Sequence, residues 1–84
     1  MEIFLTLNNA KIGKEYTILG MCQNIDIKTK TRLFELGFLK GNAIKVLSRS
    51  ISGGVLLVEI NSTCLTIRKD EASCVVIKWE RFCL

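Results

Sequence analysis

The stretch "RLFELGFLKGNAI" (residues 32–44) constrains the fold more than any other part of this chain. A helical apolar run meets Gly37, and a second glycine, Gly41, follows four residues later. Glycine readily adopts the left-handed backbone conformation that ends helices, and the residue after it then packs back on the last turn. We therefore predict that a helix ends at Gly37, that Phe38 packs on Leu33, and that Gly41 begins a tight turn into a strand.

The helix that ends at this glycine is predicted to span Asn24–Gly37. Asn24 or Asp26 can act as its N-cap, because a short polar side chain accepts hydrogen bonds from the free amides of the first turn. Four apolar residues give it an approximate stripe for the core: Ile27, Leu33, Phe34 and Leu36. Three basic side chains are expected to remain in solvent: Lys28, Lys30 and Arg32.

Short segments with strand-like alternation follow or precede this helix. Five strands are predicted: Tyr16–Met21, Ala43–Ser48, Val55–Ile60, Thr63–Arg68 and Ser73–Trp79. Their inward-facing residues are expected to include Tyr16, Ile18, Ile44, Val46, Leu65, Ile67, Val75, Ile77 and Trp79. The chain has no proline, so glycine, asparagine and serine must form its turns: Gly41–Asn42, a hairpin at Ser50–Val55 around Gly53 and Gly54, and Asn61–Ser62. A single helical turn is predicted at Lys69–Ala72, while Leu7–Glu15 has the pattern of a polar or short helical turn.

This order of elements predicts a mainly β fold in one domain, residues 1–84. Closure hides the edges of so small a sheet, which favours a closed or half-closed barrel. The five-stranded OB barrel is an alternative, but its helix comes later in the chain. We predict a small SH3-like β-barrel of about five strands, with one α-helix between the first and second strands and a short helical turn before the last.

The charge of +4 comes from cations that are spread singly along the chain. Nucleic-acid-binding strands interleave aromatic and basic residues, and that pattern is missing here, so we predict no nucleic-acid partner. The opening "MEIFLTLNNAK" lacks the basic segment and long apolar run of a signal peptide, and no apolar run is long enough to insert in a membrane. We expect a cytoplasmic protein with reduced thiols.

The sequence does not predict an enzyme. It has no histidine, which removes the commonest general base, and no cysteine has an identifiable activating neighbour. "SGG" (Ser52–Gly54) is too short for a phosphate-binding loop. The paired acids Asp70 and Glu71 are expected in the first turn of the short helix.

The four cysteines, Cys22, Cys64, Cys74 and Cys83, lack the paired spacing of a metal knuckle. The simplest interpretation places Cys64 and Cys74 as small strand residues and Cys22 in a loop. Thiolates suit zinc or iron, however. Cys64 and Cys74 could become neighbours across a strand pair and, with a terminal cysteine, form a weak adventitious site for Fe²⁺ or Zn²⁺; no cofactor is firmly implied.

The aromatic residues are few. We expect Phe34, Phe38 and Trp79 to be core residues. Phe4 and Phe82 lie near the two ends of the chain and could pack together or form an exposed apolar patch for a partner.

Taken in order, four segments resemble the FeoA family (ferrous iron transport protein A): Thr6–Ile18, Arg32–Leu47, Gly53–Ile60 and Leu65–Ile77. The matching positions are Arg32, Leu33, Glu35, Leu36, Gly37, Gly41, Gly53, Gly54, Arg68, Glu71 and Ala72. Lys40 and Val55 stand where the family commonly has proline, and Lys78–Leu84 runs beyond its common core. The resemblance covers nearly the whole chain.

The resemblance implies an SH3-like, non-catalytic cytoplasmic protein that assists ferrous iron uptake. Its implied partner is the FeoB-type membrane permease, whose cytosolic part carries a GTPase domain. The same fold occurs in metal-dependent repressors, so the alternative is a metal- or peptide-sensing regulatory module. The residues expected to shape the contact surface belong to the helix stop and the glycine hairpin: Arg32, Glu35, Leu36, Gly37, Phe38, Gly41, Gly53 and Gly54.

Overall fold

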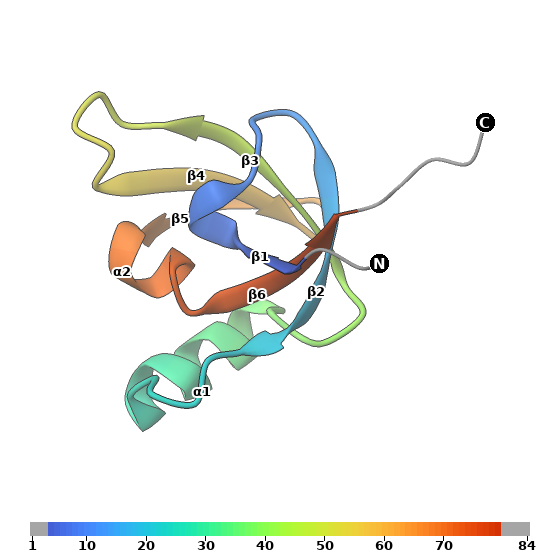
Figure 1. Ribbon diagram of the computed structural model, residues 1–84, viewed down its shortest axis with the longest axis vertical. Helices are drawn as coiled ribbons and strands as arrows, with labels where there is room; N and C mark the ends of the chain where they lie inside the picture. Colours follow the sequence, from blue (N-terminus) through green and yellow to red (C-terminus); the bar gives the residue numbers. More distant parts are fainter. Residues whose placement is uncertain (1–3, 80–84) are drawn as a thin grey trace.

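A computed structural model of the chain describes residues 4–79. Its elements in chain order are β1 (Phe4–Thr6), the 3-10 turn η1 (Leu7–Asn9), β2 (Glu15–Met21), α1 (Ile27–Leu36), β3 (Ala43–Arg49), β4 (Val55–Ile60), β5 (Thr63–Arg68), α2 (Lys69–Ala72) and β6 (Val75–Trp79). The strands form one antiparallel sheet in the order β1-β6-β2-β3-β4-β5. The sheet curls on itself, and α1 lies at one end of the molecule (Figure 1).

The mainly β prediction is confirmed, and the five predicted strands all form, with bounds shifted by two residues at most. The three residues of β1 add a sixth strand, so α1 follows the second strand rather than the first. A segment this short shows no alternation by itself, and it becomes a strand because β6 pairs with it, Leu5 opposite Ile77. Within residues 4–79, β1 and β5 remain the two edges of the sheet, which makes the barrel half-closed.

One face of the curled sheet forms the core. Its buried apolar residues are Leu7, Ala10, Tyr16, Ile18, Leu33, Phe38, Ile44, Val46, Leu56, Val58, Ile60, Ile67, Ala72, Val75 and Ile77. Seven of the residues predicted to face inward are confirmed as buried: Tyr16, Ile18, Ile44, Val46, Ile67, Val75 and Ile77. Leu65 in β5 is only partly buried. Register shifts after Ile18 in β2 and after Val46 in β3 bend the sheet, as β-bulges do.

Helix α1 begins at Ile27, where the side chain of Asp26 accepts hydrogen bonds from the amides of Lys28 (3.2 Å) and Thr29 (3.3 Å). Asp26, rather than Asn24, is therefore the N-cap. The helix is shorter than the predicted Asn24–Gly37 because the cap residue Asp26 is itself extended (φ −62°, ψ 141°) and Gln23–Asn24 form a turn.

The predicted apolar stripe of α1 is wrong. Only Leu33 is buried, whereas Ile27, Phe34 and Leu36 are exposed. Helix α1 packs on the barrel through a narrow face that contains Leu33. Residues seven apart, such as Ile27 and Phe34, share another face of the helix, and this face is exposed to solvent. Phe34 is therefore not the core residue that was expected, whereas Phe38 is buried in the core as predicted. The predictions for the side chains of Phe4, Trp79 and Phe82 lie outside what the structure describes.

Asp26→Ala is expected to lower the free energy of unfolding by about 1 kcal/mol, because two amides of the first helical turn lose their acceptor. Urea denaturation measures this change. Asn24→Ala is the matched control, and equal losses for the two variants would contradict the cap assignment.

Candidate partner-binding surface

Helix α1 exposes three of its four apolar side chains: Ile27, Phe34 and Leu36. Its outer face, defined by Ile27, Lys30 and Phe34, leaves 74% of Ile27 and 43% of Phe34 accessible to solvent. The ammonium group of Lys30 lies 5.7 Å from the centroid of the Phe34 ring, so a cation covers part of the aromatic face. Leu36 and Leu39, at the end of the helix and in the turn beyond it, are exposed as well.

The helix stop has the predicted geometry. Gly37 has φ 106° and ψ 10°, its amide donates to the Phe34 carbonyl (3.1 Å), and the amide of Phe38 donates to the Leu33 carbonyl (3.0 Å). These two bonds are the Schellman pattern, and Phe38 and Leu33 are buried in the same core cluster. The glycine therefore orients α1 on the barrel.

The turn after the helix is tied to both neighbours. The Asn42 side-chain amide donates to the Gly37 carbonyl (2.8 Å), and the amide of Gly41 donates to the Ile18 carbonyl in β2 (2.8 Å). Gly41 has φ 95°, as predicted, but Asn42 contributes a side-chain hydrogen bond rather than a left-handed backbone. Leu39 is thus presented on a turn held at both ends.

Arg32 links α1 to α2. Its guanidinium contacts the Glu71 carboxylate at 2.5 Å, and the second oxygen of that carboxylate accepts the amide of Arg68 (3.0 Å). Three of the residues that carry the family resemblance therefore meet in space. The Arg32 side chain remains 47% exposed, so it can stabilise the fold and still lie on a contact surface.

The residues expected to shape the contact surface fall into two groups. Six belong to α1 and its exit turn: Arg32, Glu35, Leu36, Gly37, Phe38 and Gly41. Gly53 and Gly54 lie in the β3–β4 hairpin, at the opposite end of the molecule (Figure 1). The Phe38 side chain is buried, so its role here is to position the turn.

Sequence reasoning missed Ile27, Lys30 and Leu39 as candidate surface residues. A signal was present, because Ile27 and Phe34 are two helical turns apart with a lysine between them. The sequence pattern places Ile27 and Phe34 in the core, and only the tertiary structure shows that Leu33 is the one buried residue of α1.

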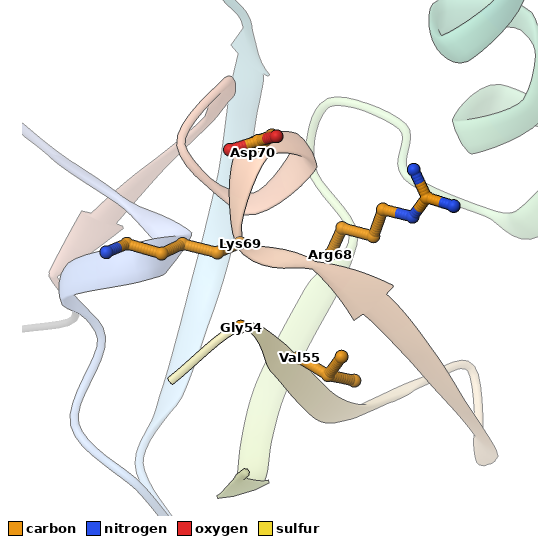
Figure 2. A pocket seen from close by; sticks show the side chains of 5 residues that line it. All are labelled: Gly54, Val55, Arg68, Lys69 and Asp70. Atoms are coloured by element: carbon orange, nitrogen blue, oxygen red, sulfur yellow. The ribbon is translucent and has the colours of Figure 1, made fainter. Parts of the chain in front are cut away.

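Beside the hairpin lies a shallow depression of about 330 Å³, lined by Gly54, Val55, Arg68, Lys69 and Asp70. Two of these lining residues are hydrogen-bonded: the amide of Lys69 donates to the Gly54 carbonyl (3.0 Å). Figure 2 shows the Arg68 and Lys69 side chains pointing in opposite directions, away from a common centre. The charged groups do not converge on one ligand atom, as a catalytic or anion site requires.

The cysteines are arranged differently from the prediction. Cys64 is exposed on β5 opposite Glu59, and Cys74 lies in the turn before β6. Three strands separate β5 from β6 in the sheet, so Cys64 and Cys74 are not cross-strand neighbours. Cys74 instead lies beside Cys22, whose amide donates to the Cys74 carbonyl (2.8 Å). Cys83 lies outside the described residues.

Between residues 4 and 79, no three cysteine, aspartate or glutamate side chains are grouped to hold a metal ion. In the same span, neither helix has the length and apolar character needed to cross a membrane.

Known proteins share this sequence and fold. The FeoA domain model matches residues 5–78. A protein of Campylobacter jejuni subsp. jejuni serotype O:2 (strain ATCC 700819 / NCTC 11168), named "Putative Fe(2+) transport protein A", is 30% identical over 73 residues, which cover 87% of this chain and 96% of that protein. The crystal structure of Stenotrophomonas maltophilia FeoA complexed with zinc, described as a prokaryotic SH3 domain protein, matches with a TM-score of 0.77 and 27% identity over 87% of this chain and 88% of that one.

A manganese-dependent transcriptional repressor has the same fold with a TM-score of 0.84, over 95% of this chain and 44% of the repressor chain. The two sequences are only 16% identical, so this match shows the fold alone. The family model, by contrast, spans nearly all of the described residues, and the Campylobacter relative aligns over almost its full length. The chain belongs to the FeoA family and has its SH3-like fold.

Proposed function

We propose that this protein is a non-catalytic, cytoplasmic accessory protein of ferrous iron transport that acts by contact with the cytosolic part of an FeoB-type permease. The Campylobacter relative carries the name "Putative Fe(2+) transport protein A", and the Stenotrophomonas protein is described as "Possibly Acting as a Bacterial Ferrous Iron Transport Activating Factor". The observation that carries the proposal for this chain is the outer face of α1. This helix buries one residue of its ten, yet it presents Ile27 and Phe34 to solvent.

The α1 face suits a protein partner because it combines apolar side chains with charge. Aromatic side chains are enriched at the centres of protein interfaces, and Phe34 is the exposed aromatic residue of this face. The Lys30 ammonium group lies over its ring, and two further cations of α1 and its exit turn, Lys28 and Lys40, are exposed. We propose that an apolar partner surface with acidic residues around it covers this face, with the cations guiding the encounter.

Titration of the isolated cytosolic domain of an FeoB-type permease, followed by isothermal calorimetry, tests this proposal. The double variant Ile27→Ser/Phe34→Ser is expected to bind at least tenfold more weakly, because hot-spot side chains of this kind contribute about 2 kcal/mol or more each. Both side chains are exposed, so the variant should keep its fold, which circular dichroism checks.

Ile51→Ser is the matched control. Ile51 is a fully exposed apolar residue in the β3–β4 hairpin, at the other end of the molecule from α1 (Figure 1). It should leave the affinity unchanged. If Ile51→Ser abolishes binding and the α1 variant does not, the contact surface is the hairpin. If the unmodified protein shows no binding, the proposed partner is wrong.

The alternative, a metal- or peptide-sensing regulatory module, is supported by the fold match to the repressor alone. Because the chain carries a net charge of +4, a DNA-binding measurement at several salt concentrations tests this alternative. Tight DNA binding that falls steeply with salt would favour the regulatory role, because each neutralised phosphate releases a counterion.

A further inference from the structure

We propose that Cys22 and Cys74 form a redox-active dithiol, a modification site that closes reversibly into a disulfide by exchange with a small-molecule disulfide such as oxidised glutathione. The inference goes beyond the proposed transport role and does not depend on it. It rests on the position of the two residues in the sheet, where the Cys22 amide is hydrogen-bonded to the Cys74 carbonyl.

The sheet brings the two residues together. Strands β2 and β6 pair in antiparallel register up to Met21 and Val75. One residue further along each strand, Cys22 faces Cys74, and the Cys22 amide donates to the Cys74 carbonyl at 2.8 Å. Facing residues of antiparallel strands have Cα atoms about 4.5–5.5 Å apart, which lies within the range that disulfides span.

The Cys22 side chain also influences the titration of Cys74. A hydrogen bond with the Cys22 side chain, assisted by burial, raises the pKa of the Cys74 thiol to about 11. The raised pKa disfavours the Cys74 thiolate, so the proposed exchange begins at Cys22. Both side chains are half-buried, so a small reagent can reach them.

The exchange balances in two steps. The Cys22 thiolate attacks one sulfur of glutathione disulfide, forming a mixed disulfide and releasing one glutathione thiolate. Cys74 then gives up its proton to solvent and attacks the Cys22 sulfur, which forms the Cys22–Cys74 bond and releases the second glutathione. The dithiol loses two electrons, and glutathione disulfide gains them.

The bond would join two junctions near the candidate surface. Cys22 lies between β2 and α1, and Cys74 lies between α2 and β6. The Arg32–Glu71 ion pair already links the same two helices non-covalently. Oxidation would therefore join the start of the β2–α1 connection to the α2–β6 turn and close a long covalent loop.

The experiment uses the full chain with Cys64→Ser/Cys83→Ser, so that only the facing pair remains. Folded protein is incubated with oxidised glutathione, digested with trypsin without reduction, and analysed by mass spectrometry. We expect the tryptic peptides EYTILGMCQNIDIK and DEASCVVIK to be linked, with an intact mass about 2 Da lower, reversed by dithiothreitol. The oxidised form should also unfold at a temperature higher by about 10 °C or more, because the crosslink closes a loop of roughly 50 residues.

Cys74→Ser in the same background is the control, and it should stop at a glutathione adduct on Cys22. Stable glutathione adducts without a linked peptide in the folded dithiol protein would overturn the proposal. It would also be overturned if the link formed only after unfolding in urea, since the native sheet would then not bring the thiols together.

Discussion

Gly37→Val is expected to lower the free energy of unfolding by about 2–3 kcal/mol, because a β-branched residue would be forced into the left-handed backbone that ends α1. Gly37 has φ 106°, far from the conformations that valine adopts. Its new Cβ would also lie 2.8 Å from the side-chain nitrogen of Asn61. That side chain can move, so the backbone supplies most of the cost. The midpoint temperature should fall by about 10 °C or more in a domain of this size.

Two further variants separate backbone strain from crowding. Gly54→Ala should be nearly neutral, because Gly54 does not need a left-handed backbone and its Cβ would contact only the Ser52 hydroxyl at 3.6 Å. Gly37→Asn should lose less than Gly37→Val, since asparagine tolerates the left-handed region. An unchanged melting temperature for Gly37→Val would show that the helix stop is assigned to the wrong residue.

Leu33→Ala is expected to cost about 2–5 kcal/mol, as truncations of fully buried leucines do. Leu33 is completely inaccessible to solvent and is the one buried residue of α1. The loss should therefore fall mainly on the attachment of the helix. Thermal denaturation gives the total, and hydrogen exchange should show the amides of Ile27–Leu36 losing protection first.

Phe34→Ala, one residue further along, is the matched control. Phe34 is 43% exposed, so its truncation should cost about 1 kcal/mol or less. If both variants lose the same stability, α1 packs on the barrel through a broader face than Leu33. Retained protection of α1 in Leu33→Ala would lead to the same conclusion.

Much of the fold could be predicted because its signals are local. The turn at Gly53–Gly54 and the helical turn Lys69–Ala72 depend on residues close in the chain, and both form where expected. The strand alternation likewise identified Ile44 and Ile77 as inward-facing, since a period of two places alternate residues on one face. The candidate surface was predicted only in part, because exposure depends on what the rest of the fold covers.

The amino-acid sequence by itself determined where the chain turns and which backbone conformation it adopts there, as at Asp26 and Gly37, because these choices depend on a few neighbouring side chains and amides. Only the tertiary structure decided what those elements meet. It made a strand of β1 by pairing it with β6, exposed Phe34, and placed Cys74 beside Cys22 instead of Cys64. Strand order and helix docking depend on contacts between distant residues, whose free energy comes from burying one shared core and leaves no local pattern in the sequence.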